Sequence, residues 1–211
     1  MTGFVSVDEA ARTLREGRFV IIADDEGREN EGDLVIAAEY ASAEAINFMA
    51  IHGRGLVCCA LAPEVVDRLG LKPMVPPEDN DSGYGTPFTV SVEAREGVTT
   101  GISAPDRART VSVLIDPSSE PRDLVAPGHM FPLRAHPDGV LARGGQTEAS
   151  VDLARLAGLR PGAVICEIMN DDGTMARRPE LETFSARHGI PITTTEALRR
   201  YLLARNSLAA E

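Results

Sequence analysis

Residues 19–38 read FVIIADDEGRENEGDLVIAA, two short apolar runs separated by a polar and strongly acidic stretch. Each apolar run, 19–23 and 34–38, has the length and composition of a strand that is buried on both faces. The sequence therefore predicts a strand, an acidic loop and a second strand, and a fold that is built around a sheet.

Helix and strand signals alternate on both sides of this unit. Ser6 and Glu9 form a capping box that predicts a helix over 7–16, and Ser42 is expected to cap a helix that reaches about His52. Further along, we expect four strands: 56–61, a half-exposed strand over 88–93, a buried strand over 111–115 behind a second capping box at Ser103 and Asp106, and 163–169. We also expect four helices: one between Pro63 and Gly70, one from a Thr147 cap to about 157, one over 180–188, and a last one that starts at Thr193 and Glu196.

Two stretches show no helical or strand period. Residues 72–87 are rich in Pro, Asp, Asn and Gly and are the best candidate for a mobile loop or lid, and residues 116–145 are expected to be irregular. The alternation of helices and strands elsewhere predicts a single α/β (α+β) domain over 1–211 with a mixed sheet.

Composition argues against a nucleic-acid-binding, membrane-spanning or secreted protein. The chain of 211 residues is 43% hydrophobic and has a net charge of −11, so its field repels nucleic acid and anionic membrane surfaces. No apolar stretch approaches the roughly 20 residues of a membrane span, and the first residues lack the features of a signal peptide. Three cysteines without ligand or disulfide spacing are expected to be reduced, which favours a cytoplasmic protein.

The acidic loop is the first candidate site. Residues 24–33 place six carboxylates around one arginine directly after a buried strand. Carboxylate oxygens are the ligands that Mg²⁺ and Mn²⁺ prefer, so the loop is a candidate metal site. The alternative from composition is a solvated acidic hairpin.

A second candidate lies where Arg143-Gly144-Gly145-Gln146-Thr147 leads into a helix. Free N–H groups and the positive end of the helix dipole, beside a guanidinium and a hydroxyl, suit a phosphate group. The alternative is a glycine turn with an ordinary threonine cap. A metal cluster together with an anion site predicts a phosphorylated substrate.

Two further side chains are candidates for proton transfer. Glu167 lies in an apolar strand, where burial would raise its pKa, although period two turns it to solvent or to an arginine equally well. His129 lies in a turn and is a candidate proton shuttle, although a turn histidine is commonly just exposed.

Five segments together carry a resemblance to a known family. They are 24–33, the stretch from Gly85-Thr86 through 99–104, Pro127-Gly128-His129, 143–149, and the stretch from Cys166-Glu167 through 170–176. In this order, over nearly the whole chain, they resemble the 3,4-dihydroxy-2-butanone 4-phosphate synthases of riboflavin biosynthesis. The resemblance implies a three-layer α/β sandwich, a homodimer with active sites near the interface, and conversion of ribulose 5-phosphate to the butanone phosphate and formate.

The resemblance also implies roles for individual residues. It places the metal-binding glutamate at Glu29, catalytic groups at His129 and Glu167, and the abstraction of the C3 proton at Asp33 or Glu31. Its other implications are sugar contacts at Arg28 and Asp33 with support from Asp24, Glu26 and Glu31, and a substrate contact at Glu167. They also include a phosphate loop at Arg143, Gly144, Gly145, Gln146 and Thr147, and pocket positions at Cys58 and Thr100. The cofactor it implies is Mg²⁺ or Mn²⁺, with two ions per site.

One departure from the family pattern concerns the metal. The family has a metal-binding histidine where this chain has Gln146. Gln146 is expected to be the second metal ligand beside Glu29, but a weaker one, because it offers only a neutral carbonyl oxygen. Two alternatives follow: a diverged enzyme that acts on another phosphorylated sugar, or a catalytically silent protein that binds a sugar phosphate. The chain ends at Glu211, so the cyclohydrolase domain that is fused to many members is expected to be absent.

Overall fold

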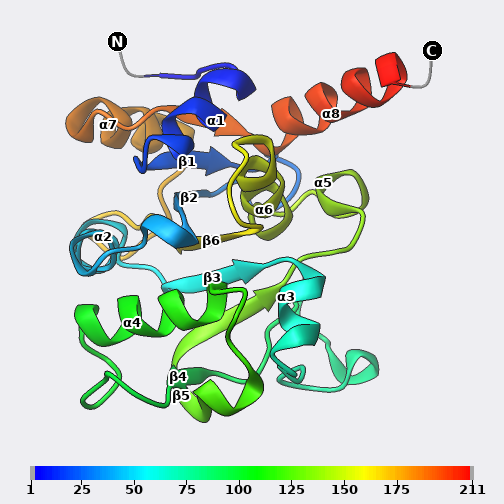
Figure 1. The fold of residues 1–211 in the computed structure, drawn as a ribbon. Coiled ribbons are helices and arrows are strands. Elements are labelled where there is room, and N and C mark those ends of the chain that lie inside the picture. The colour runs from blue at the N-terminus through cyan, green and yellow to red at the C-terminus, as the bar shows by residue number, and fades with distance from the viewer. Residues whose placement is uncertain (1–2, 210–211) are drawn as a thin grey trace.

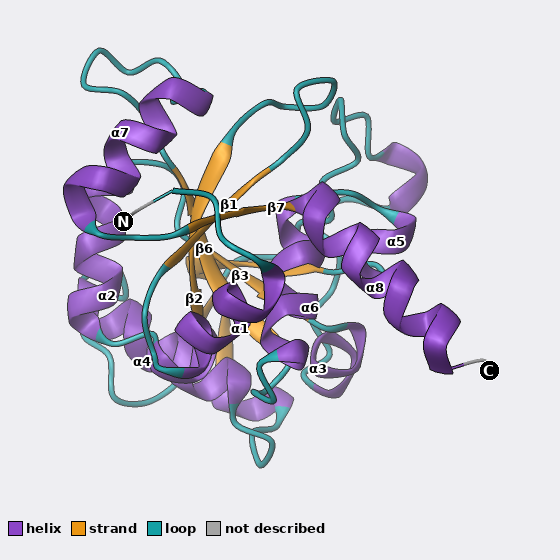
Figure 2. Cartoon of the chain, turned by 90° about the horizontal axis from the view of Figure 1, so that it is seen from above, coloured by secondary structure: helices purple, strands orange, loops and turns teal. Residues whose placement is uncertain are grey.

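A computed structural model describes residues 3–209 as a mixed sheet flanked by helices on both faces. The seven strands lie in the order β4-β5-β3-β6-β2-β1-β7 (Figure 1). The view from above places α2, α4 and α7 on one side of the sheet and α1, α6 and α8 on the other (Figure 2). The predicted three-layer α/β fold with a mixed sheet is confirmed.

The bounds of the elements follow the sequence signals closely in most places. The strands are β1 Val20–Ala23, β2 Gly32–Ala37, β3 Cys58–Leu61, β4 Val92–Ala94, β5 Leu124–Arg134, β6 Gly162–Glu167 and β7 Ile192–Thr194. The helices are α1 Val7–Arg15, α2 Ala43–Phe48, α3 Pro63–Arg68, α4 Ala104–Ile115, α5 Gly139–Ala142, α6 Gln146–Leu156, α7 Arg178–His188 and α8 Thr195–Ala209. A π-helical turn, Met49–Gly53, follows α2 directly.

Strand register places the candidate site at the centre of the sheet. β6 pairs antiparallel with β2 on one side and with β3 on the other, so that Glu167 lies opposite Asp33 and Ile165 lies opposite Cys58. Because residues two apart on a strand share a face, these four side chains share one face of the sheet. β1 pairs antiparallel with β2, which closes the acidic loop into a hairpin.

The predicted strand over 111–115 is wrong, because these residues form the second half of α4. The Ser103 hydroxyl accepts the N–H of Asp106, and the helix that begins there runs on to Ile115 without a break. Its buried positions, which include Thr110, Val111 and Leu114, form one helical face. A five-residue apolar run does not by itself distinguish a strand from the buried end of a helix. Here the run belongs to the helix that the Ser103 cap begins.

The predicted irregular stretch over 116–145 is also wrong, because it contains β5, the longest strand of the sheet. Pro127, Gly128 and Pro132 interrupt its pattern, so the sequence hides it. Tertiary pairing nevertheless makes it a strand, parallel to β3 and antiparallel to β4. The alternating stretch 88–93 is shorter than predicted, since the ladder begins only at Val92 after isolated bridges.

Two predicted caps are displaced, the first by two residues and the second by one. Helix α6 has Gly145 at its N-cap and begins at Gln146, so Thr147 lies inside the helix and does not cap it. The hydroxyl that accepts the N–H of Ala197 at the start of α8 belongs to Thr194 and not to Thr193.

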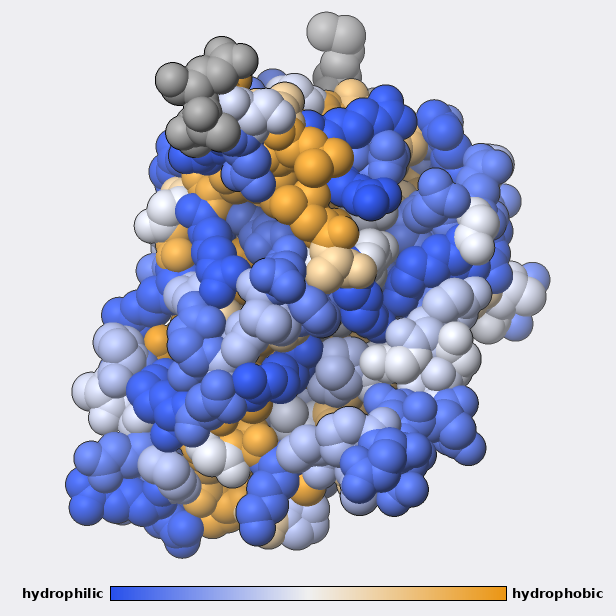
Figure 3. Space-filling model, turned by 90° about the vertical axis from the view of Figure 1, so that its right-hand side faces the viewer, coloured by the Kyte–Doolittle hydropathy of each residue, from blue (hydrophilic) through white to orange (hydrophobic). Residues whose placement is uncertain are grey.

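Hydrophilic residues predominate on the face of the molecule shown in Figure 3, and hydrophobic residues gather in a patch toward the top of that view. Within residues 3–209, none of the helices combines the length and the hydropathy that crossing a membrane requires.

Candidate active site

Asp33 and Glu167, paired across β2 and β6, line a cavity of about 130 Å³. Most of the residues predicted for the site meet there. The lining consists of Arg28, Glu29, Asp33, Cys58, Thr86, Phe88, Leu133, Arg143, Gln146, Thr147, Ile165 and Glu167. The cavity therefore joins the acidic hairpin, the centre of the sheet and the first turn of α6.

The carboxyl groups around this cavity raise one another's pKa. Burial raises the pKa of Asp33 well above its usual range, and the charges of Glu167 and Glu29 raise it further. Burial also raises the pKa of Glu167, although its Oε2 accepts the N–H of Leu56 at 2.8 Å. Burial raises the pKa of Glu31 as well. Such groups are suited to accept or hold a proton near neutral pH.

The acidic hairpin turn is held rigidly by hydrogen bonds to its backbone. The buried carboxylate of Asp24 accepts the N–H groups of Glu29, at 3.1 Å, and of Glu31, at 2.8 Å. Nη1 of Arg177 donates to the carbonyl oxygens of Glu29 and Asn30 at 2.5 and 2.6 Å. Asp24 does not line the cavity, so it acts on the shape of the turn.

Arg28 is held on several sides. Its Nη1 donates to Asp24 Oδ2 at 2.7 Å and to Gln146 Oε1 at 2.9 Å, and its Nη2 lies 3.0 Å from Glu29 Oε1. Its guanidinium lies over the ring of Tyr84, 4.9 Å from the centroid, and the Tyr84 hydroxyl donates to the Arg28 carbonyl at 2.7 Å. The segment predicted as a lid therefore contacts the site through Tyr84.

The other end of the cavity is the first turn of α6. Nη1 of Arg143 donates to the fully buried carboxylate of Glu148 at 2.6 Å, which fixes the guanidinium. A Cβ on Gly145 would lie 2.3 Å from Nη1 of Arg143, so the close approach of this guanidinium requires a glycine. Thr147 and the free N–H groups of the turn lie beside it, and the arrangement suits a phosphate group.

Several predicted residues lie outside the cavity. Nδ1 of His129, on β5, contacts Oε1 of Glu93, on β4. Gly101, which follows Thr100, approaches the same Glu93 carboxylate so closely that a Cβ would overlap it. His129 therefore pairs with Glu93 outside the cavity, and Thr100 precedes the glycine that approaches the same carboxylate. The predicted residues that do not line the cavity are Asp24, Glu26, Glu31, Thr100, His129, Gly144 and Gly145.

The residues that the sequence analysis missed make hydrogen bonds or ion pairs to predicted site residues or to the acidic turn. They are Tyr84 and Arg177 around the acidic turn, Glu93 beside His129, and Glu148 beside Arg143. Two of them carried a signal, because Glu148 lies within the 143–149 motif and Tyr84 lies within the predicted lid, 72–87. Arg177 and Glu93 reach these positions from parts of the chain in which no site residue was predicted.

The donor set of the cavity fits a hard divalent cation. Among residues 3–209, no three His, Cys, Asp or Glu side chains converge as a complete ligand set. Oδ1 of Asp33 is nevertheless buried without a hydrogen-bond partner among these residues, and Glu29 and Glu167 line the same cavity. Magnesium is commonly bound by one or two carboxylates, with water and substrate oxygens as its other ligands, and these residues fit that pattern.

The three cysteines are free and buried. Burial raises the pKa of Cys58 well above its usual range, and the neighbouring Glu167 and Asp33 charges add to this. Burial also raises the pKa of Cys59 to about 12. Because its pKa is raised, Cys58 contributes a neutral thiol to the cavity wall. The nucleophilic form of cysteine is the thiolate, so Cys58 is not expected to act as a nucleophile.

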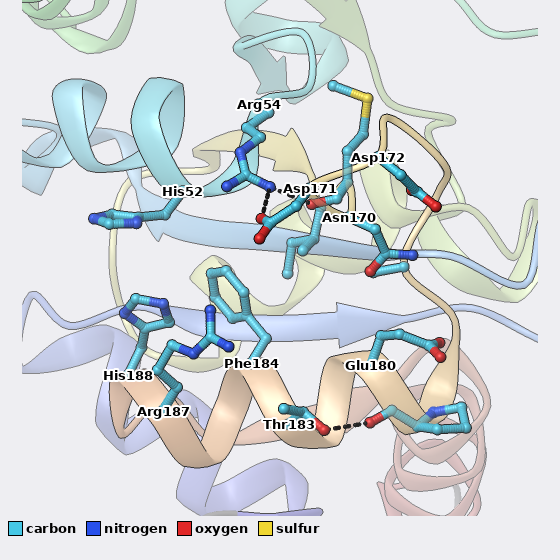
Figure 4. A pocket seen from close by; sticks show the side chains of 14 residues that line it. His52, Arg54, Asn170, Asp171, Asp172, Glu180, Thr183, Phe184, Arg187 and His188 are labelled. Atoms are coloured by element: carbon cyan, nitrogen blue, oxygen red, sulfur yellow. Dashed lines mark hydrogen bonds and ion pairs between the residues drawn. The ribbon is translucent and has the colours of Figure 1, made fainter.

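A larger cavity, of about 480 Å³, lies between the π-helical turn and α7 (Figure 4). His52 and His188 face one another there with ring centroids 4.8 Å apart, and Arg54 pairs with Asp171. It contains none of the residues predicted for the site.

Comparisons with known proteins identify the family of this chain. The family model described as 3,4-dihydroxy-2-butanone 4-phosphate synthase matches residues 8–201. The chain is 58% identical to the Pseudomonas aeruginosa protein of that name over 94% of this chain and 54% of the relative, and 50% identical to the Cronobacter sakazakii protein over 99% and 95%. The chain thus spans about half the length of several relatives that it matches.

A solved structure is also similar over nearly its whole length. It is a 3,4-dihydroxy-2-butanone 4-phosphate synthase in complex with two magnesium ions, with 42% identity and a TM-score of 0.89 over 94% of this chain and 97% of that one. The family predicted from the motifs is confirmed. The chain belongs to the 3,4-dihydroxy-2-butanone 4-phosphate synthase family.

Proposed function

We propose that this chain converts D-ribulose 5-phosphate to L-3,4-dihydroxy-2-butanone 4-phosphate and formate, the lyase reaction for riboflavin biosynthesis. The observation that carries the proposal is the cavity that joins paired carboxyl groups of raised pKa, Asp33 and Glu167, to the anion-binding first turn of α6. The names of relatives with 50–58% identity support the same reaction.

The substrate would lie along the cavity with its phosphate at α6. Arg143, fixed by Glu148, and Thr147 would bind the phosphate oxygens together with backbone N–H groups at Gly144 and Gly145. The sugar would then extend toward the acidic hairpin and the sheet.

Glu29 would hold a divalent cation, Mg²⁺ or Mn²⁺, with two ions per site. When bound, these ions polarise the carbonyl and hydroxyl oxygens of the sugar and make its C3–H more acidic. Asp33 or Glu31 accepts the C3 proton, since the raised pKa of each carboxyl suits a base near neutral pH. Water then leaves from C1 and the carbon skeleton rearranges by a 1,2-shift. A water molecule adds to the C4 carbonyl, the bond to C4 breaks and C4 departs as formate, so that no water is lost overall, while Glu167 and His129 serve these later proton transfers.

We further propose that the enzyme is a homodimer. Thr100 and His129 do not line the cavity that holds Glu167, and a second copy of the chain offers a way to complete the site. The net charge of −11 argues against nucleic acid or anionic membrane as a partner, and free, buried thiols fit a location in the cytoplasm.

Formate release from ribulose 5-phosphate by the purified chain tests the function. We expect release with Mg²⁺ and with Mn²⁺ and none with a chelator. The Gln146→His variant serves as the comparison. Formate from that variant but not from the natural chain would contradict the proposal, because Gln146 would then have redirected or silenced the site.

A further inference from the structure

The side chain of Gln146 is oriented by Arg28. Oε1 of Gln146 accepts a hydrogen bond from Nη1 of Arg28 at 2.9 Å, and the same nitrogen donates to Asp24 at 2.7 Å. A guanidinium only donates, so the oxygen of the amide has to face Arg28 and the nitrogen faces away from it. The orientation of this amide is therefore decided by its partner.

This orientation places the only oxygen of the amide against a cation. An amide coordinates Mg²⁺ through its carbonyl oxygen, and the oxygen of Gln146 is already paired with a cation. A divalent ion at the same oxygen would lie against the positive charge of Arg28. Gln146 is thus poorly placed to replace the imidazole that the family pattern has at this position.

The nitrogen of the amide lacks a partner. Gln146 is 5% exposed and lines the cavity, and its Nε2 is buried without a hydrogen-bond partner among residues 3–209. A buried donor of this kind costs free energy until an acceptor reaches it. The adjoining first turn of α6 is where an oxygen-rich, anionic ligand is favoured.

We propose that Gln146 is a substrate-binding and positioning residue and not a metal ligand. Its carbonyl oxygen holds Arg28 in place, and its Nε2 donates a hydrogen bond to an oxygen of the bound sugar phosphate. This inference rests on the proposed function for the identity of the substrate. It follows that the metal depends on Glu29, on water and on substrate oxygens, and not on residue 146.

Two equilibrium measurements test the inference without turnover. The first is the affinity for Mn²⁺ alone, from the electron paramagnetic resonance signal of the free ion. The second is the affinity for ribulose 5-phosphate in the presence of a chelator, by calorimetry. The variant is Gln146→Leu, which is close in size and has neither hydrogen-bonding group, and the matched control for metal loss is Glu29→Gln.

We expect Gln146→Leu to keep its affinity for Mn²⁺ within about twofold and to bind ribulose 5-phosphate roughly 3- to 10-fold more weakly, the loss of one or two hydrogen bonds. Glu29→Gln should lose Mn²⁺ affinity. A tenfold loss of Mn²⁺ affinity in Gln146→Leu, or unchanged binding of ribulose 5-phosphate, would overturn the inference.

A second variant covers a failure of Gln146→Leu to fold. Gln146→Glu keeps an acceptor for Arg28 and places a carboxylate at a helix N-terminus, where it is favoured, but it removes the N–H donor. It should also bind ribulose 5-phosphate more weakly, and unchanged binding would contradict the inference. If the natural chain fails to bind ribulose 5-phosphate both with a chelator and with Mg²⁺, the proposed function fails, and the Mn²⁺ measurement still decides whether Gln146 holds the metal.

Discussion

Asp33 and Glu29 line the same cavity but differ in their surroundings. Asp33 is buried in the sheet with one oxygen unpaired, whereas Glu29 lies in the hairpin turn and contacts Arg28. Burial of the Asp33 carboxyl group costs free energy, whereas the Glu29 side chain is 25% exposed. Their substitution should therefore have different effects.

Glu29→Gln should abolish formate release while the fold remains intact. The amide removes the charge that attracts the cation but keeps the size of the side chain, so we expect the rate to fall by about two orders of magnitude or more. The measurement is the formate rate against Mg²⁺ concentration, with the melting temperature as the control for folding. Activity with the natural Mg²⁺ dependence would remove Glu29 from the metal site.

Asp33→Asn should stabilise the metal-free protein. Since burial raises the pKa of Asp33, the folded state loses stability as pH rises from the usual pKa of an aspartate, about 3.9, to the higher folded value, and the loss is complete above it. The amide removes this cost. We expect a melting temperature about 2–8 °C higher at pH 7.5, equivalent to about 1–2 kcal/mol, together with loss of formate release. An unchanged or lower melting temperature would contradict a buried, uncompensated charge.

At the scale of elements, two contacts between segments stand out. Strands β4 and β5 position His129, and the π-helical turn after α2 meets the end of α7 through two histidines. Gly128 allows the close approach of β5 to β4, because a Cβ there would lie 2.1 Å from the carbonyl carbon of Val92. His52 follows α2 in the π-helical turn, and His188 is the last residue of α7. Both contacts join segments that are distant in the sequence.

Gly128→Ala should destabilise the protein, since its added methyl group meets backbone and not a flexible side chain. We expect a loss of about 1–3 kcal/mol in the free energy of unfolding, measured with urea, as for other overpacked positions. Gly83→Ala is the matched control, because a Cβ at Gly83 meets no atom within 4 Å. Equal urea midpoints for Gly128→Ala and Gly83→Ala would contradict this prediction, because β5 would then shift away from β4 without a loss of free energy of unfolding.

The His52–His188 contact should make the protein less stable in mild acid. Burial lowers the pKa of His188, and the neighbouring His52 and Arg187 lower it further. A lowered histidine pKa means that the unfolded chain takes up the proton first, so stability falls as pH drops below about 6.5. The test compares melting temperatures from pH 8 to pH 5 in the natural chain and in His188→Gln, whose profile should be flatter. Parallel profiles would exclude this contact as the cause.

At the scale of the whole molecule, the predicted catalytic residues fall into two groups. Arg28, Glu29, Asp33 and Glu167 line the cavity, whereas Thr100 and His129 do not, and His129 contacts Glu93. If each active site of a homodimer combines groups from both copies, two inactive variants should complement one another when they are mixed.

Mixing Glu29→Gln with His129→Ala tests this arrangement. After exchange of subunits, half of the dimers are mixed and one of their two sites is intact, so activity should return to about one quarter of the natural rate. The measurement is formate release from the mixture against each variant alone, with the mass in solution from sedimentation. A monomer, or a mixture as inactive as its parts, would exclude shared sites.

The sequence by itself determined the local features. The local features are the strands on both sides of the acidic loop, the caps at Ser6, Ser42 and Ser103, and the helix that follows the glycine turn at 144–145, and all depend on residues a few positions apart. Such short-range patterns of hydrophobicity and capping are visible without any knowledge of the fold. The motifs of the family are of the same kind, and they were sufficient to identify it.

Only the tertiary structure decided which distant groups meet. β5 is a strand because β3 and β4 satisfy its backbone, although its own prolines and glycine conceal it. Asp33 faces Glu167 through strand register, and Gln146 turns its oxygen to Arg28 across 118 positions of sequence. These contacts depend on pairing and packing between segments that are distant in the sequence. The neighbour that each side chain meets determines whether it offers an oxygen, a proton or a charge to the site.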